Sequence, residues 1–393
     1  MNNDPVDIAI IGGGIHGAGV AQAAAAAGYS VALLEKNALA SGTSSKSSKL
    51  IHGGLRYLEN LDIRLVHESL KERELLVKNA PELVQWQPFF IPVYRDTSRR
   101  PWFIRTGLSL YTVLSGFSEH GRFRTVPKSE WRQLDGLKTE GLHSVFQYWD
   151  AQTDDHLLTH AVMASAQSLG AELLCPAEFL QGQKSDSGYQ LQYRHNHETR
   201  QLDARVVINA AGPWAKSVTE KFIPALPAIT VENIQGTHIE LPGLLEHGCY
   251  YLEVPEDRRA VFAMPWKGRT LFGTTEHHFT QAPEQVQPLQ QELDYLLKVY
   301  RHYFPHRDDT IINAWAGLRV LPADDGTSFK SSRETHLITD QTERPAALSI
   351  FGGKLTAYRA TAEKVIKTVQ ESLPERETRA ETVKTTLSPI DKI

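Results

Sequence analysis

The chain of 393 residues is long enough for two or three domains, and its 41% hydrophobic and 22% charged residues are ordinary for a globular protein. Its net charge of −4 gives it no general attraction to nucleic acid, whose binding proteins are usually strongly basic. Two cysteines cannot form a disulfide framework, which argues against a disulfide-stapled secreted protein. We expect both Cys175 and Cys249 to be small buried hydrophobic residues.

The sequence predicts no targeting segment and no membrane-spanning helix. No basic stretch precedes the first apolar run, so a signal peptide is not expected. No window reaches the roughly 18 uncharged residues that a membrane-spanning helix needs. We therefore expect a cytoplasmic location.

The first 35 residues predict a strand, a helix and a second strand. The short, β-branched run from Val6 to Ile11 is typical of a buried parallel strand. The alanine-rich stretch from Gly14 to Ala27 predicts a helix that ends at Gly28, and Tyr29 to Leu34 predicts the next strand. A βαβ start of this kind predicts an α/β fold with a doubly wound sheet.

The turn between this strand and helix carries the spacing Gly12-x-Gly14-x-x-Gly17. In dinucleotide-binding domains the first glycine permits the turn, the second lets the backbone approach a pyrophosphate, and the third lets helix pack on strand. The helix N-terminus also offers free N–H groups to the phosphates. Glu35 ends the second strand, where an acid accepts bonds from ribose hydroxyls and disfavours the 2′-phosphate of NADP.

Further along the chain, apolar periodicity predicts helices at 60–80 and 153–169 and strands at 189–193 and 206–209. The stretch 88–140 contains several prolines and scattered glycines. We therefore expect it to be an insertion rather than part of a sheet.

The second half of the chain predicts another sheet and a return to the first. Residues 228–280 alternate strand-like runs and turns, as in an antiparallel sheet, and 281–303 predict a helix. Strands at 315–319, 337–339 and 348–351 are expected to return to the first domain.

These elements predict two domains and a tail. A last helix is expected at 356–370, and a charged, proline-interrupted segment follows it as a loose tail. We assign residues 1–87, 141–225 and 315–370 to a discontinuous cofactor-binding domain, residues 88–140 and 226–314 to a substrate or cap domain, and residues 371–393 to the tail.

Two later features favour FAD over NAD as the dinucleotide. Residues 207–214 are similar to the second turn by which FAD proteins return to their cofactor. Gly352-Gly353-Lys354 opens another helix, whose N-terminus suits the N1–C2=O edge of an isoalloxazine because that edge becomes anionic on reduction. An ordinary helix-starting turn is the alternative for this glycine pair.

Several motifs together resemble FAD-dependent glycerol-3-phosphate dehydrogenases of the D-amino-acid-oxidase superfamily. They are I-G-G-G-I-x-G-A-G from Ile11, S-S-K-L-I-H-G-G-L-R-Y-L-E from Ser47, N-A-A-G-P-W from Asn209, Q-G-T-H from Gln235, F-G-T-T-E from Phe272, A-G-L-R from Ala316 and F-G-G-K-L-T-A-Y-R from Phe351. These motifs occur in the family's order and span nearly the whole chain. Val320 stands where family members usually have proline, and the chain ends about where they begin a C-terminal helical domain. We therefore expect a short form of this family.

The resemblance implies oxidation of sn-glycerol 3-phosphate to dihydroxyacetone phosphate, with quinone or another compound as electron acceptor. It implies a non-covalently bound FAD, held by residues Gly12, Gly14, Gly17, Glu35, Ser44, Ser45, Gly212, Gly352, Gly353, Lys354, Leu355 and Thr356. A phosphate monoester calls for guanidinium and ammonium groups, and Arg56, Arg319 and Lys354 each lie next to a glycine or a turn. The resemblance places these three around the substrate with Tyr57, and Arg319 is also a candidate catalytic residue.

His52 is the preferred candidate for the base that accepts the hydroxyl proton, because an imidazole titrates near neutrality. A structural histidine and a covalent flavin tether at this position are the alternatives. His238 is the second candidate, as a base or as a donor to the developing oxyanion.

Paired histidines and acids do not predict a metal site. His277-His278 would point to opposite faces of a strand, and Pro305 interrupts the helical spacing between His302 and His306. The pairs Asp154-Asp155 and Asp324-Asp325 are expected in loops, solvated or capping a helix.

Two other functions remain open at this point: an FAD-dependent oxidase or dehydrogenase for an amino or 2-hydroxy acid, and a flavin-binding subunit without turnover. The segment 102–117 is apolar, with aromatic residues at its ends and Arg99, Arg100 and Arg105 nearby. It predicts either weak contact with a membrane surface or a helix packed under the flavin domain. The sequence does not predict the oligomeric state.

Overall fold

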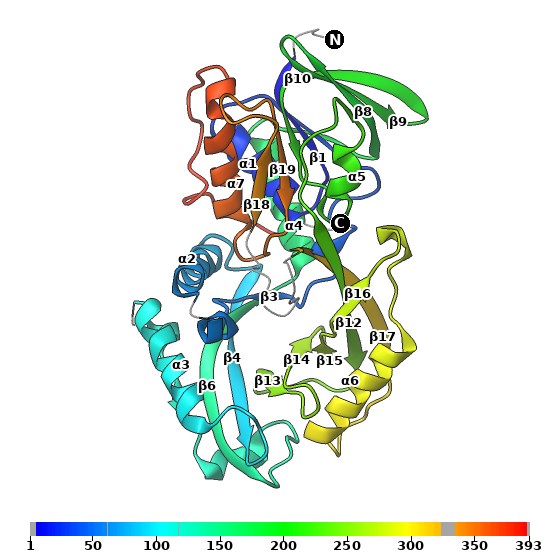
Figure 1. Ribbon diagram of the computed structural model, residues 1–393. Helices are drawn as coiled ribbons and strands as arrows, with labels where there is room; N and C mark the ends of the chain where they lie inside the picture. The colour runs from blue at the N-terminus through cyan, green and yellow to red at the C-terminus, as the bar shows by residue number, and fades with distance from the viewer. Residues whose placement is uncertain (1–4, 61, 117, 324–334, 391–393) are drawn as a thin grey trace.

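The computed structural model describes residues 5–60, 62–116, 118–323 and 335–390, which form two sheets with helices packed against them. The first sheet lies in the upper half of the molecule in Figure 1 and the second in the lower half. The predicted α/β architecture, with a doubly wound sheet and a second, largely antiparallel sheet, is confirmed.

The first sheet is built around parallel strands, as the βαβ start predicts. β1 (Val6–Ile11) lies between β2 (Val31–Leu34) and β10 (Glu198–Asn209) and is parallel to both. Because β1 and β2 are covered on both faces, their residues are almost all apolar and buried. The remaining strands are β7 (Glu172–Leu174), β8 (Ala177–Ser185), β9 (Gly188–His195), β11 (Phe222–Ile223), β18 (His336–Thr339) and β19 (Ala347–Phe351).

Helix α1 (Ile15–Ala26) packs against α4 (Asp155–Ser168) and α7 (Tyr358–Val369) beside this sheet. Small side chains let α1 lie deep in the core, where all of its residues but one are buried. Two further helices are α2 (Ile63–Asn79) and the short α5 (Ala215–Thr219). The helices predicted at 60–80, 153–169 and 356–370 are therefore confirmed as α2, α4 and α7.

The second sheet is centred on β12 (Val231–Leu241). This strand pairs in antiparallel fashion with β15 (Arg269–Gly273), β16 (His277–Phe279) and β17 (Asn313–Pro322). The other strands are β3 (Leu50–Ile51), β4 (Val84–Tyr94), β5 (Arg124–Thr125), β6 (Leu142–Thr153), β13 (Cys249–Glu253) and β14 (Ala260–Trp266), and the helices are α3 (Pro101–Leu114) and α6 (Gln290–Tyr303). The antiparallel sheet predicted within 228–280 is confirmed.

Two expectations about this sheet are wrong. The stretch 88–140 is not merely an insertion, because β4 pairs with β6 along its whole length. Among the described pairings, β4 meets β13 only at Phe89 and Phe90, so its prolines remove few ladder hydrogen bonds. The strand at 315–319 does not return to the first sheet either, because β17 runs beside β12 in the second.

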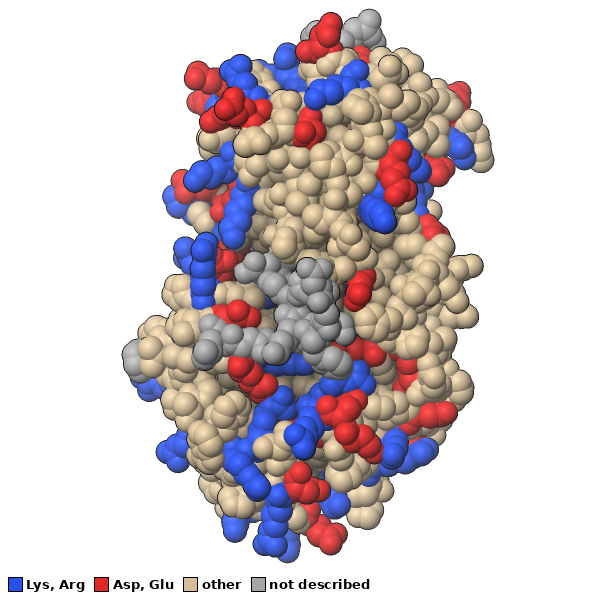
Figure 2. All heavy atoms as spheres, viewed as in Figure 1, with Lys and Arg blue, Asp and Glu red and all other residues tan. Residues whose placement is uncertain are grey.

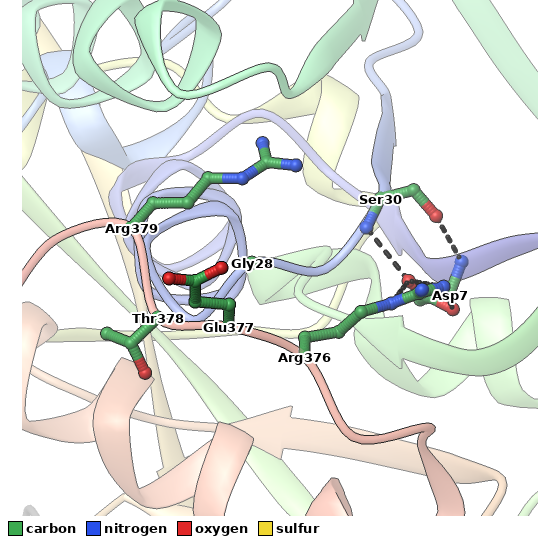
Figure 3. Close-up of a pocket in the computed structure, with 7 residues that line it drawn as sticks. All are labelled: Asp7, Gly28, Ser30, Arg376, Glu377, Thr378 and Arg379. Carbon is green, nitrogen blue, oxygen red and sulfur yellow. Dashed lines mark hydrogen bonds and ion pairs between the residues drawn. The ribbon is translucent and has the colours of Figure 1, made fainter.

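The segment after α7 is not the loose tail that its composition predicts. Arg376 reaches across to the carboxylate of Asp7, which also accepts the N–H of Ser30, as Figure 3 shows. The N–H of Arg379 donates to the carbonyl of Ala26 at the end of α1 (2.7 Å). The last carbonyls of a helix lack partners within it, so the segment supplies donors that α1 needs.

The same segment also adds an apolar side chain to the first core. Leu387 is 4% exposed and packs in the hydrophobic cluster that contains α1 and α4. Its N–H donates to the carbonyl of Asn79 at the end of α2 (2.7 Å). Cys249 is buried as expected, whereas Cys175 is only partly buried and its thiol donates to the carbonyl of Asn37.

Replacing Leu387 with alanine should destabilise the protein, although it lies outside any helix or strand. Deleting buried methyl groups from a leucine costs about 2–5 kcal/mol, so we expect a thermal midpoint several degrees lower. Ile390→Ala is the matched control, because Ile390 is 37% exposed in the same segment. Equal midpoints for the two variants would show that this segment does not contribute to the core.

Candidate functional site

A cleft of about 1100 Å³ lies at the junction of the two sheets. Much of its first-sheet wall lies at the carboxyl ends of parallel strands: residues 11–16 at the end of β1, 34–37 at the end of β2, 210–214 after β10 and 352–356 after β19. The carboxyl ends of parallel strands meet at one edge of a sheet, where α/β proteins bind their ligands. Residues of β12 and β17 form much of the opposite wall.

The glycine turn after β1 is packed so closely that side chains are excluded. A Cβ on Gly12, whose φ is +108°, would lie 2.7 Å from the carbonyl oxygen of Ala210. A Cβ on Gly17 would lie 1.9 Å from the carbonyl oxygen of Gly12. Gly17 itself does not line the cleft, which suits a role in packing α1 on β1.

Two side chains hold this turn from neighbouring loops. The carboxylate of Glu35 accepts the N–H of Gly13 (2.7 Å) and the N–H of Asn37 (2.8 Å). Ser44 Oγ accepts the N–H of Ile15 (2.9 Å) at the start of α1. Each carboxylate oxygen has a second lone pair, so Glu35 can still accept bonds from ribose hydroxyls in the cleft.

His16, which is not among the predicted site residues, also lines the cleft. Burial lowers its pKa to about 4, so the imidazole is neutral at physiological pH. Its Nδ1 is buried without a hydrogen-bond partner among the described residues, and a Cβ on Gly353 would lie 2.1 Å from its Nε2. The side chain therefore joins the glycine turn to the loop 352–356. Its position between Gly14 and Gly17 is the sequence feature that could have marked it as a cleft residue.

The remaining predicted cofactor residues divide into two groups. Gly14, Ser44, Gly212, Gly352, Gly353, Lys354, Leu355 and Thr356 line the cleft beside Gly12 and Glu35. Ser45 does not line it, and its hydroxyl donates to the carbonyl of Gly42 (3.3 Å).

Several candidate substrate residues gather at the end of the cleft near β3. The N–H of His52 donates to Thr356 Oγ1 (3.2 Å), which brings His52 next to the loop 352–356. Lys354 Nζ lies 3.9 Å from the centroid of the Tyr57 ring, within range of a cation–π contact. Arg56 does not line the cleft. Burial raises the pKa of the nearby Tyr251 hydroxyl, and the positive charge of Arg56 offsets part of that rise.

Arg319 projects from β17 into the same region. One guanidinium nitrogen donates to the carbonyl of Thr275 (2.8 Å), and another pairs with Glu276 Oε1 (3.2 Å). A guanidinium binds anions through charge-assisted hydrogen bonds, which makes Arg319 a candidate contact for a phosphate in the cleft. The acid at 276 belongs to the F-G-T-T-E motif, but its pairing with Arg319 was not predicted.

His238 sits on β12 directly opposite Trp315 of β17, with the two rings stacked 5.7 Å apart. Its Nε2 lies 2.9 Å from Ser48 Oγ. Burial, together with the positive charges of Lys49 and Arg319, lowers the pKa of His238 to about 3. The ring is therefore neutral at physiological pH, which suits a hydrogen-bonding role better than proton acceptance.

The acidic pair at the start of α4 behaves in two different ways. Asp154 caps the helix as expected, by accepting the N–H groups of His156 and Leu157. Asp155 is fully buried instead of solvated, and it pairs with Lys49 Nζ at 2.5 Å. The pair Asp324-Asp325 lies outside the described residues. Within the described part of the chain, no group of three or more histidines, cysteines or acids could hold a metal ion.

Comparisons with known proteins agree with this geometry. The family model described as FAD dependent oxidoreductase matches residues 7–359. The chain is therefore a member of this FAD-dependent oxidoreductase family, and FAD is its cofactor. The glycine turn, the Glu35 acceptor and the helix N-terminus of α1 fit the dinucleotide that the family binds.

Individual relatives narrow the likeness to polyol phosphate dehydrogenases. The chain is 34% identical to D-erythritol 1-phosphate dehydrogenase of Brucella abortus, covering 94% of this chain and 74% of that protein. It is 37% identical to glycerol-3-phosphate dehydrogenase of Pseudomonas aeruginosa, covering 93% and 71%. The FAD complex of glycerol-3-phosphate dehydrogenase from Bacillus halodurans superposes with a TM-score of 0.76 at 25% identity, over 98% of this chain and 68% of that one.

Replacing Glu35 with glutamine should weaken FAD binding. An amide accepts ribose hydroxyls more weakly than the carboxylate, and it holds the N–H groups of Gly13 and Asn37 less firmly. A charge-assisted bond contributes about 1.5–3 kcal/mol, so we expect roughly ten- to a hundredfold weaker binding. Titration of the apoprotein with FAD, followed by flavin fluorescence, measures this. Glu178→Gln is the control, because Glu178 lines the cleft but pairs with Arg194. Equal affinity in both variants would contradict the role given to Glu35.

Proposed function

We propose that the protein oxidises sn-glycerol 3-phosphate to dihydroxyacetone phosphate, with quinone or a similar compound as the final electron acceptor. One observation carries the proposal: a single cleft is lined both by a dinucleotide-binding turn and by Arg319, Lys354 and His52. Two relatives that cover most of the chain are dehydrogenases of polyol phosphates by name.

The chemistry needs a hydride acceptor, a proton acceptor and an anchor for the phosphate. FAD, when bound, supplies the hydride acceptor. His52, held next to Thr356 by its own N–H, takes the proton from the substrate hydroxyl. His238 remains neutral and donates or accepts a hydrogen bond near the reacting oxygen.

Arg319 and Lys354 anchor the phosphate in this proposal. The phosphate shares the guanidinium of Arg319 with Glu276, whose carboxylate pairs with it at 3.2 Å. The Tyr57 ring beneath Lys354 Nζ holds the ammonium group over the cleft. Arg56 does not line the cleft. We therefore propose that the phosphate is bound by Arg319 and Lys354 alone, and not by the predicted trio that includes Arg56.

We further propose that the two sheets are the cores of the two domains. The first sheet with α1, α4 and α7 binds FAD non-covalently, and the second sheet supplies the substrate wall. The proposed boundaries then shift from those of the sequence analysis, because β6 and β17 belong with the second sheet.

A second substrate is favoured by the relative from Brucella abortus, whose name specifies D-erythritol 1-phosphate. This compound presents the same phosphate and secondary alcohol with one more carbon. The two substrates therefore need the same cations and base, and erythritol 1-phosphate adds one hydroxyl-bearing carbon.

An anaerobic screen tests the function directly. Glycerol 3-phosphate or D-erythritol 1-phosphate should bleach the flavin absorbance, and acid precipitation of the same protein should release free FAD. Bleaching by D-amino acids or 2-hydroxy acids alone would support the alternative oxidase. No bleaching by any of these compounds would favour a flavin-binding subunit without turnover.

The same assay tests the anion site. Arg319→Ala should raise the KM for the bleaching substrate about ten- to a hundredfold, since a charge-assisted bond contributes about 1.5–3 kcal/mol. Arg124→Ala is the control, because Arg124 pairs with Glu130 away from the cleft. An unchanged KM in the Arg319 variant would place the phosphate elsewhere.

We also propose weak contact of α3 with an anionic membrane surface. Trp102 is 69% exposed and Phe103 is 40% exposed, whereas Ile104, Leu108 and Tyr111 bury the opposite face of the helix. No helix in the described ranges has the length and apolar character needed to cross a bilayer. Lys and Arg side chains gather over the lower half of the face in Figure 2, with acids among them. Arg99, by contrast, is held by Glu59 and Glu253.

Flotation with liposomes tests this contact. We expect partial recovery with phosphatidylglycerol vesicles at low salt, and loss of recovery at high salt because charge attraction is screened. Trp102→Ser should abolish recovery, whereas Ile223→Ser, which changes a 51% exposed apolar residue on β11, should not. Recovery that is the same for both variants would exclude α3 as the contact.

A further inference from the structure

The loop after β3 carries His52, and its backbone is hydrogen-bonded to a buried polar cluster of Arg73, Tyr111 and Asp150. The N–H of Gly53 donates to both the Tyr111 hydroxyl (3.0 Å) and Asp150 Oδ1 (3.2 Å). The Tyr111 hydroxyl in turn donates to Asp150 Oδ1 (2.8 Å). Arg73 pairs with the same carboxylate oxygen at 2.5 Å.

Every side chain of this cluster comes from a different element and is shielded from solvent. Arg73 lies on α2, Tyr111 on α3 and Asp150 on β6, and their exposed fractions are 0%, 2% and 2%. Burial and the Asp150 carboxylate raise the pKa of Tyr111 well above its usual value, so its hydroxyl keeps its proton and can donate to that carboxylate while accepting from Gly53. Buried groups of this kind are costly to leave unpaired.

The backbone at this point has little freedom to move. A Cβ on Gly53 would lie 2.4 Å from both the Tyr111 hydroxyl and Leu70 Cδ2, so the loop is pressed directly onto the cluster. On the other side of His52, Leu50 and Ile51 pair with β6. The histidine is therefore fixed by its neighbours on both sides.

We propose that Tyr111 and Asp150 are positioning residues for His52: they hold the Gly53 N–H and thereby set the place of the imidazole in the cleft. Neither residue lines the cleft, so neither contacts the substrate or FAD. The inference rests on the proposed role of His52 as the base. Misplacement of a catalytic group by about 1 Å can cost roughly a hundredfold in rate.

The test compares two tyrosine variants that each lose a hydrogen-bonded hydroxyl group. Tyr111→Phe removes one of the two acceptors of the Gly53 N–H, whereas Tyr94→Phe removes a 2.6 Å bond to the carbonyl of Lys138 at the end of β4. Anaerobic stopped-flow measures flavin reduction by glycerol 3-phosphate. We expect Tyr111→Phe to lower the limiting rate about ten- to a hundredfold with little change in KM, and Tyr94→Phe to leave both unchanged. Equal rates in the two variants would overturn the inference.

A double-mutant cycle separates this inference from the proposed function. In a His52→Ala background, Tyr111→Phe should cause no further slowing, because its effect passes through His52. If the rate reduction in the double variant equals the product of the two single-variant reductions, the positioning role is overturned. If His52→Ala alone leaves flavin reduction unchanged, the proposed base is wrong, and that result is independent of Tyr111.

A second variant covers the case in which Tyr111→Phe does not fold with FAD bound. Asp150→Asn keeps the shape and an acceptor oxygen but removes the charge that holds Arg73 and Tyr111. Asp150→Asn should likewise lower the limiting rate and leave KM unchanged. In the His52→Ala background it should cause no further slowing. A raised KM with an unchanged limiting rate would contradict the inference.

Discussion

The segment from Thr43 to Tyr57 is the connection on which the geometry of the cleft depends. Ser44 binds the first turn of α1, and Thr43 donates to the carbonyl of Leu318 on β17. Further along, Leu50 and Ile51 pair with β6 in the second sheet. One short stretch therefore touches the cofactor turn and both walls of the cleft, so the distance between the two binding regions is set by local hydrogen bonds.

Buried charge beside this segment determines how the imidazoles can act. Lys49 and Asp155 are both nearly inaccessible, and removing either would leave an unpaired charge in the interior, which is strongly destabilising. Their pairing also keeps a positive charge close to His238, which helps to hold its pKa near 3. A protonated His238 is therefore disfavoured, which is why His52 and not His238 is the base that we propose.

The sequence predicts what local rules determine and misses what distant contacts decide. The glycine spacing, the alanine-rich helix and the acid at Glu35 each carry their own physical reason within a few residues. The pairing of β4 with β6 joins residues that are far apart in the chain, and two prolines in β4 masked it. The contact of Arg319 with Glu276 and the exclusion of Arg56 from the cleft likewise depend on strand register and loop direction, which no local pattern specifies.

Helix α3 shows how one amphipathic element can serve two surfaces at once. Its exposed face presents Trp102 and Phe103, and its buried face presents Tyr111 to the loop that carries His52. The sequence pattern identified the apolar segment but could not divide its residues between these faces, because both sides carry aromatic side chains. In the folded chain the division follows from a polar constraint: Tyr111 must face inward, since only there can its hydroxyl meet Gly53 and Asp150. The rings of Trp102 and Phe103, between two and three turns away, then face outward.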